Sequence, residues 1–298
     1  MDPFSGEGEL LNITTAFYTH AYQTVLAFDT SSLSSENKTT AQILKYRAQI
    51  AVGDASSVIS SLKQSQDAAS RSIVALAQQA AGNHSTALET ALALSESDAE
   101  EAVVQICCGT VLAVAGEYVK AVDLLSKHQG SLEAVALLVQ IHLMQNRTDL
   151  AVKEVAAAKR WAQDSLLINL AEAWTNLREG GQEKYQSAYY VYEELASTPG
   201  NTSPTALVGQ AVSEIHLGRF EEAEAALQQA VGMANADVQA IANSVVLASI
   251  IGKKSEDVQG LFQQLREKDA EHALLRDLEE KNQLFDDAAA KYSAKVAA

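Results

Sequence analysis

Small and apolar residues recur along the chain with the spacing of amphipathic helices, in pairs of helices separated by tight turns. The clearest pair spans residues 204–217 and 220–231. On its second helix, residues at positions i, i+4 and i+7 form one apolar stripe toward the first helix: Ala223, Leu227 and Ala230. Small Ala211 lies on the first helix, where the two helices must approach closely. The pattern predicts a helix–turn–helix unit.

The turns of these units recur with a period of 34 residues. Gly82 and Gly116 are 34 residues apart, as are Gly218 and Gly252, and three such periods separate Gly116 from Gly218. Helix–turn–helix units of this length are typical of tetratricopeptide repeats. We therefore predict an all-α fold, a right-handed α-solenoid of tetratricopeptide-like helix–turn–helix repeats.

Two turns depart from this period. Asn146 replaces glycine in a short unit, and it tolerates the left-handed backbone that glycine supplies elsewhere. The next unit is long, with Gly180–Gly181 at the end of its first helix, so the regular period returns at Gly218. Because no long linker interrupts the pattern, we predict a single solenoid domain over residues 1–298. Its capping helices are expected at about 255–298, where apolar residues alternate with many charges.

The composition and charge of the chain exclude several classes of partner. The chain has only three prolines and 6% aromatic residues, a composition that favours helices. Its formal net charge of −16 would repel phosphate backbones and anionic lipids, so we expect no nucleic-acid partner. The acidic N-terminus has no apolar stretch, and the aliphatic runs are too short to span a membrane. We expect a soluble cytoplasmic protein.

Motifs for catalysis are missing from the sequence. It has no phosphate-binding loop, no nucleophile elbow and no zinc-protease motif, and its six histidines are scattered. We therefore predict no catalytic residue, no cofactor and no metal site. Cys107 and Cys108 are adjacent in an apolar helix and indicate buried, reduced thiols. An enzyme that uses one of them as a nucleophile is the alternative.

A partner-binding surface is expected on the first helices, which usually line the inner surface of such a solenoid. The candidates are the residues of those helices that do not face the second helices: Ala136, Gln140, Leu143, Leu170, Trp174, Leu177, Val208, Val212, Ile215, Ala242 and Val246. Their apolar character favours a stable interface with a folded partner. Packing of repeat against repeat is the alternative.

Aromatic residues gather in the long unit, at Trp161, Trp174, Tyr189, Tyr190 and Tyr192. Core packing of this irregular repeat is the favoured interpretation, and anchoring of a partner is the alternative.

Several short segments form a signature that is more specific than the repeat period. In chain order they are Ala16-Phe-Tyr18, Tyr46-Arg-Ala48, Val139-Gln-Ile141, Ala173-Trp174, Gly180-Gly181, Ser187-Ala-Tyr-Tyr190, Gly209-Gln-Ala211, Gly218-Arg219 and Val245-Val-Leu247. Together they resemble a fungal-like member of the coatomer epsilon subunit family, a component of the COPI coat. The Gly-Gly insertion followed by Ala-Tyr-Tyr is the most specific part of this resemblance.

The resemblance implies a curved tetratricopeptide-like solenoid without enzymatic activity. It implies binding to the C-terminal domain of the coatomer alpha subunit, and through it an indirect association with other coatomer subunits. It further implies a cytoplasmic protein that meets Golgi membranes and COPI-coated vesicles only peripherally, through the coat, in retrograde Golgi-to-ER and intra-Golgi transport. The alternative function is a tetratricopeptide-type adaptor or co-chaperone that binds short peptides.

Overall fold

The computed structural model describes residues 6–197, 203–233 and 237–292, and all its regular elements in those ranges are helices. The contacts between backbones divide the chain into two compact units, Met1–Ser203 and Pro204–Ala298, which we describe separately. The single domain over residues 1–298 stays a prediction.

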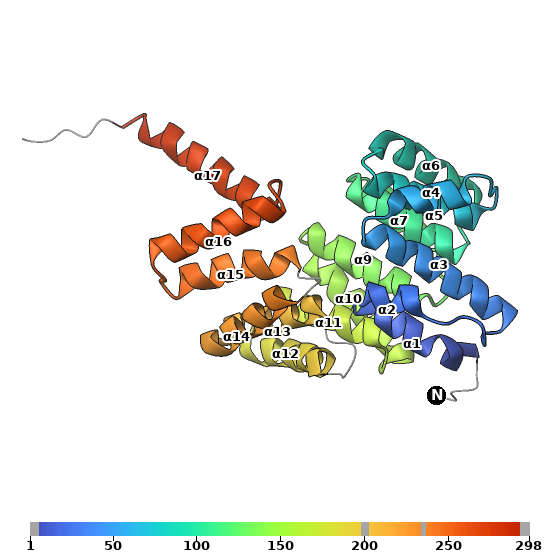
Figure 1. Ribbon diagram of the computed structural model, residues 1–298, viewed down its shortest axis with the longest axis horizontal. Coiled ribbons are helices and arrows are strands. Elements are labelled where there is room, and N and C mark those ends of the chain that lie inside the picture. Colours follow the sequence, from blue (N-terminus) through green and yellow to red (C-terminus); the bar gives the residue numbers. More distant parts are fainter. Residues whose placement is uncertain (1–5, 198–202, 234–236, 293–298) are drawn as a thin grey trace, which may run out of the picture. The chain divides into compact units, whose positions relative to one another are not determined.

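The first unit comprises α1 to α12 (Figure 1). The helices are α1 Gly6–Tyr18, α2 Tyr22–Ala27, α3 Ser35–Ala51, α4 Ala55–Leu62, α5 Ala68–Ala80, α6 His84–Ser97, α7 Ala102–Val114, α8 Tyr118–Leu125, α9 Leu132–Met144, α10 Thr148–Ala162, α11 Leu166–Glu179 and α12 Gln182–Ser197.

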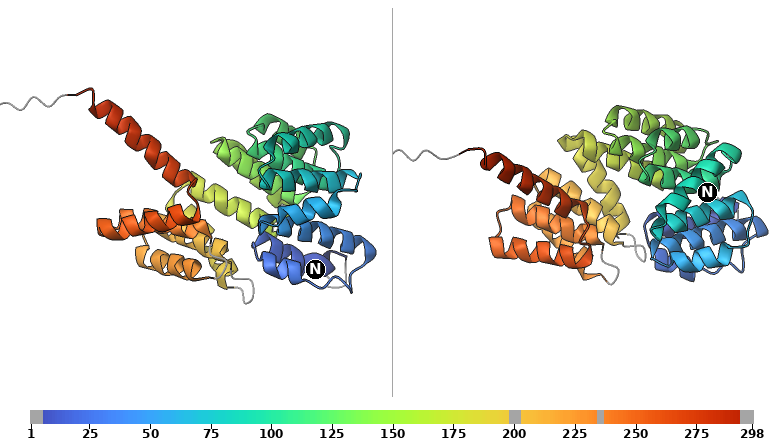
Figure 2. Two further views of the ribbon diagram at one scale, coloured as in Figure 1. Left: turned by 45° about the horizontal axis from the view of Figure 1, so that its top comes forward. Right: turned by 90° about the horizontal axis from the view of Figure 1, so that it is seen from above.

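Successive helix pairs stack on one another in this unit. Helix α5 contacts its partner α6 and also α7, α7 contacts α8 and α9, and α9 contacts α10 and α11. Each first helix therefore touches its own partner and the first helices of its neighbours, as Figure 2 shows from two further directions. This is how a helical-repeat solenoid buries its core, and it confirms the predicted all-α solenoid of tetratricopeptide-like repeats.

The second unit comprises the remaining helices, α13 Pro204–Leu217, α14 Phe220–Gly232, α15 Val238–Ile250, α16 Ser255–Lys268 and α17 Ala273–Ala289. Helix α13 contacts α14 and α15, and α15 contacts α16. Leu265 of α16 and Leu275 of α17 are buried in one cluster with Ile241 and Ala242 of α15. The predicted capping segment contains α16 and α17, and its residues 293–298 lie outside the described residues.

The helices of the described ranges include none that is both long and apolar enough to cross a membrane.

Close helix approach explains the small residues of the repeat pattern. Ala211 and Ala223 have no exposed surface, and a Cβ atom added to Gly109 of α7 would lie 3.1 Å from Cγ of Leu125 in α8. Side chains larger than glycine or alanine at these positions would force the paired helices apart. The predicted close approach is confirmed for α7 and α8, and the complete burial of Ala211 and Ala223 agrees with it for α13 and α14.

Most turns inside the pairs share one hydrogen-bonded geometry. The turn at Gly180–Gly181 between α11 and α12 departs from it, because the amide of Gly180 donates to the carbonyl oxygen of Asn176, four residues earlier, at 3.0 Å. At Gly116, φ is +80°, and the next amide donates to the carbonyl oxygen five residues earlier at 2.9 Å. At Asn146, φ is +59°, and the amide of Arg147 donates to the carbonyl oxygen of His142 at 2.8 Å. This is the bond that closes a helix in the Schellman motif. The predicted substitution of Asn146 for a turn glycine is therefore confirmed.

Replacing Asn146 with valine should lower the free energy of unfolding by about 1–2 kcal/mol, because a β-branched residue is strained at positive φ. The variant also loses the hydrogen bond that Arg178 donates to the Asn146 side chain. Asn146→Gly keeps the backbone unstrained and loses only that bond, so it is the matched control. Urea unfolding followed by circular dichroism measures both, and equal midpoints for the two variants would contradict the assignment.

Candidate partner-binding surface

The predicted contact residues of the first unit lie on α9 and α11, which contact each other. They range from exposed Gln140, through half-buried Leu143, Trp174 and Leu177, to buried Ala136 and Leu170. Trp174 packs with Leu143 against one buried cluster and with Leu177 against the next. The structure thus brings most of this set together, and Gln140 is its exposed member.

The predicted residues of the second unit lie on α13 and α15. Val208 and Ala242 are buried, and Val212 and Ile215 are half-buried. Val246 is the exposed member, with 38% of its surface accessible. Leu170 and Ala242 belong to buried clusters of their own units. The proposal of partner contact below therefore rests on the exposed and half-buried members.

The aromatic residues of the long unit and Trp161, which ends the preceding unit, divide between core and surface. Tyr192 is buried and accepts a hydrogen bond from Trp174. Burial raises the pKa of Tyr192 to about 12 despite this hydrogen bond. Trp161 and Tyr190 are 52% and 59% exposed. Core packing therefore accounts for Tyr192, while Trp161 and Tyr190 lie on the surface.

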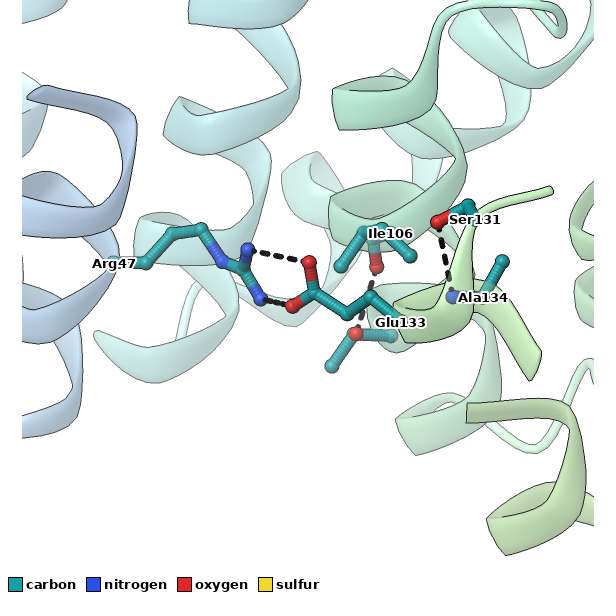
Figure 3. Close-up of polar contacts among 6 residues, drawn as sticks. Arg47, Ile106, Ser131, Glu133 and Ala134 are labelled. Atoms are coloured by element: carbon teal, nitrogen blue, oxygen red, sulfur yellow. Dashed lines mark hydrogen bonds and ion pairs between the residues drawn. The ribbon is translucent and has the colours of Figure 1, made fainter. Parts of the chain in front are cut away.

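A polar contact between distant segments was not anticipated from the sequence. The guanidinium of Arg47 in α3 donates two hydrogen bonds to the carboxylate of Glu133 in α9, one of them from Nη1 at 3.1 Å (Figure 3). Only 13% of the Arg47 side chain and 24% of the Glu133 side chain are exposed. The same guanidinium lies over the ring of Phe17 in α1, 4.7 Å from its centroid. One buried cation therefore links α1, α3 and α9.

The start of α9 positions the carboxylate of Glu133 for its contact with Arg47. Ser131 caps α9 by accepting a hydrogen bond from the amide of Ala134 at 3.3 Å, so Glu133 lies in the first helical turn. The amide groups of a first turn favour negative charge. Burial lowers the pKa of Arg47, but the charge and hydrogen bonds of Glu133 outweigh it, and the net shift is upward. The guanidinium of Arg47 therefore stays charged at neutral pH.

The two cysteines of α7 have no exposed surface. Burial raises the pKa of Cys107 to about 11 and that of Cys108 to about 12. A nucleophilic cysteine needs a lowered pKa and access to substrate. The predicted burial is thus confirmed, and these properties do not suit a catalytic thiol.

A groove of about 570 Å³ lies in the second unit between α14, α15 and α16. Its lining includes apolar Leu247 and the acidic residues Glu224, Glu256 and Asp257. The cation of Lys253 is paired with Glu224. A groove that binds acidic peptide ends needs free cationic groups, and this groove presents the opposite charge.

The chain is similar to known proteins in both sequence and fold. The family model described as "Coatomer epsilon subunit" matches residues 6–293. The chain belongs to the coatomer epsilon subunit family. Two relatives agree with this assignment across most of their length. A probable coatomer subunit epsilon of Schizosaccharomyces pombe is 32% identical over 253 residues, which are 84% of this chain and 84% of that protein. Coatomer subunit epsilon-1 of Arabidopsis thaliana is 30% identical over 285 residues, 93% of this chain and 94% of that protein.

Solved structures support the fold of this coatomer epsilon family member. A tetratricopeptide repeat protein from Parabacteroides merdae matches with a TM-score of 0.60 and 14% identity, covering 79% of this chain and 95% of that one. A chain of the APC/C hetero-tetramer Cut9–Hcn1 matches with a TM-score of 0.64 and 15% identity, covering 90% of this chain and 54% of that one. At such low identity these matches concern the fold alone.

Proposed function

We propose that this chain is a non-catalytic structural subunit of the COPI vesicle coat that binds and stabilises the C-terminal domain of the coatomer alpha subunit. In this role it acts in retrograde Golgi-to-ER and intra-Golgi transport. It is cytoplasmic, and it reaches Golgi membranes only peripherally, through the coat. Membership of the coatomer epsilon subunit family over residues 6–293 is the observation that carries the proposal.

The surface of the chain supports this role. Each unit offers a partly apolar surface of its own to a folded partner, with Gln140 and Leu143 on the first helices of the first unit and Val246 on a first helix of the second unit. The net charge of −16 disfavours direct binding to nucleic acid or to anionic lipids. Co-expression with the full alpha subunit is the direct test. We expect the alpha subunit to co-purify with this chain in a stoichiometric amount. Purification of this chain without the alpha subunit would overturn the proposal.

Replacing exposed Gln140 on α9 with arginine should weaken alpha-subunit binding about tenfold or more, because a charge buried in an interface core without a partner carries a large desolvation cost. Ala157→Arg is the matched control, since it adds the same charge to an exposed position of α10, the second helix of that pair. Dissociation constants from isothermal titration calorimetry compare them, and circular dichroism should remain helical for both. Equal affinities for the two variants would show that the interface does not lie on the first helices.

A tetratricopeptide-type adaptor for short acidic peptides has less support. The acidic residues Glu224, Glu256 and Asp257 along the second-unit groove would repel such a ligand.

A further inference from the structure

Helix α16 contains a glycine that the packing of the chain itself does not explain. Gly260 lies inside the helix, where glycine is the least favourable residue after proline. A glycine inside a helix can let a neighbouring helix approach closely, as Gly109 does for Leu125. A Cβ atom added to Gly260, however, would meet no other part of the described chain within 4 Å. Within the described residues, the fold therefore gains no contact from this glycine.

The space beside Gly260 is the groove of about 570 Å³ between α14, α15 and α16. Leu247 of α15 and Leu261 of α16 line this groove together with Gly260, so the glycine exposes the helix backbone next to apolar side chains. Ligand sites commonly have volumes of about 300–1,000 Å³. Glycine is also the residue that lets a ligand approach a backbone closely. A ligand that lies against α16 would therefore explain Gly260.

The groove follows α16 for more than two helical turns. Its lining includes Glu256 and Asp257 in the first turn, Gly260 and Leu261 in the second, and Gln264 in the third. At 1.5 Å per residue these positions span about 12 Å, the length of about four extended residues. The side-chain amide of Gln264 can both donate and accept hydrogen bonds, which suits the backbone of an extended chain. The groove therefore fits a short polypeptide segment better than a single small cation.

The end of the groove at the start of α16 is acidic. The groove lining contains three carboxylates, those of Glu224, Glu256 and Asp257, and one cation, that of Lys253, so its net charge is −2. Lys253 is paired with Glu224. Glu256 and Asp257 are exposed, and neither side chain has a hydrogen bond or an ion pair within the described chain. Two carboxylates are therefore available to a cation of a ligand.

A second hollow extends this acidic end. It has a volume of about 640 Å³ and adjoins the groove at Glu224, which lines both. It adds the carboxylates of Glu221 and Glu222 and the guanidinium of Arg219. Carboxylates in a first helical turn stabilise their own helix, so the acidic residues alone do not indicate a ligand. What indicates one is that they meet Gly260 and apolar side chains in a single groove.

We propose that this groove binds a short extended segment of another protein, with lysine or arginine at the acidic end and an apolar side chain over Gly260. Opposite charges on a groove and its ligand select the partner and speed its association. The same charge repels acidic peptides and anionic membranes. None of the predicted partner-contact residues lines the groove, so this site does not rest on the proposed function.

Peptide binding to the full chain tests the proposal. The probe is a library of hexapeptides with blocked ends and every residue type at each position, and bound peptides are identified by mass spectrometry. Peptides that combine lysine or arginine with a nearby leucine, isoleucine, valine or methionine should be enriched at least about tenfold over acidic ones. Fluorescence polarisation then gives the dissociation constant of the most enriched peptide for the chain and its variants.

Two substitutions locate the site. Gly260→Met fills the groove and should raise the dissociation constant about tenfold or more. It should also raise the urea midpoint of unfolding, because methionine favours a helix more than glycine does. A variant that is more stable and binds less tightly has not lost binding through unfolding. The matched control is Gln259→Met, since Gln259 is exposed on the same helix and does not line the groove.

Glu256→Gln tests the charge and should weaken binding about threefold or more. Glu183→Gln is its control, because Glu183 is an exposed carboxylate in the first turn of α12, outside the groove.

The proposal fails if the library shows no preference for basic peptides, or if Gly260→Met binds the peptide as well as Gln259→Met. Equal affinities of Glu256→Gln and Glu183→Gln would likewise contradict it. A dimer of the free chain that Gly260→Met abolishes would assign the groove to a second copy instead. All these measurements use the chain without the alpha subunit, so their failure would leave the proposed function unaffected.

Discussion

Replacing Glu133 with glutamine is expected to lower the free energy of unfolding by about 2–3 kcal/mol, because the change strands the buried charge of Arg47. The Arg47 side chain is 13% exposed and directs both of its hydrogen bonds in this contact to the Glu133 carboxylate. An amide can accept at most one of them and supplies no compensating charge. The ring of Phe17 offers only a partial substitute for a negative partner.

Urea unfolding of the full chain measures this effect, and two further variants isolate its cause. Glu117→Gln breaks the exposed ion pair with Lys120, where both side chains are at least 40% accessible, and should cost under about 0.5 kcal/mol. The double variant Arg47→Met with Glu133→Leu removes both charges and should recover most of the lost stability. If Glu133→Gln were as mild as Glu117→Gln, the contact would contribute no more than a surface ion pair.

The repeat architecture was predictable because its determinants are local. A turn that needs positive φ favours glycine or asparagine, so Gly116 and Asn146 reveal the turns without knowledge of distant contacts. A close helix crossing likewise requires a small residue at a fixed offset from the turn, as at Ala223. Both signals lie within one repeat, where the sequence distance between contacting residues is short.

Contacts between distant repeats were not predictable. Arg47 and Glu133 are separated by 86 residues, and which helices meet over that distance depends on small rotations summed over several repeats. Exposure on first helices was equally hard to assign, because these helices are contacted by several neighbours. Ala136 and Leu170 therefore follow the same sequence pattern as exposed Gln140 but are buried.

The buried thiols are expected to make the fold sensitive to alkaline pH. In the folded chain burial raises the pKa of Cys107 to about 11 and that of Cys108 to about 12, from the ordinary thiol value of 9.0. The unfolded chain therefore loses these protons first, and it binds fewer protons than the folded chain above pH 9. Stability is complete below pH 9 and declines as the pH rises toward 11. Together the two thiols should lower the free energy of unfolding by about 4 kcal/mol between pH 8 and pH 10.5.

Unfolding midpoints of the wild-type chain and of the double variant Cys107→Ala with Cys108→Ala, measured across this pH range, test the expectation. The variant should be less stable at pH 8, because removing two buried sulfur atoms loses packing, yet its stability should change less with pH. Tyr18 and Tyr192, whose pKa values burial also raises, remain in both proteins, so the difference between the two curves isolates the thiols. Parallel curves would mean that the thiols titrate normally in the folded chain. In that case they would also react quickly with a thiol reagent near pH 8, and an enzyme with a cysteine nucleophile would return as a serious alternative.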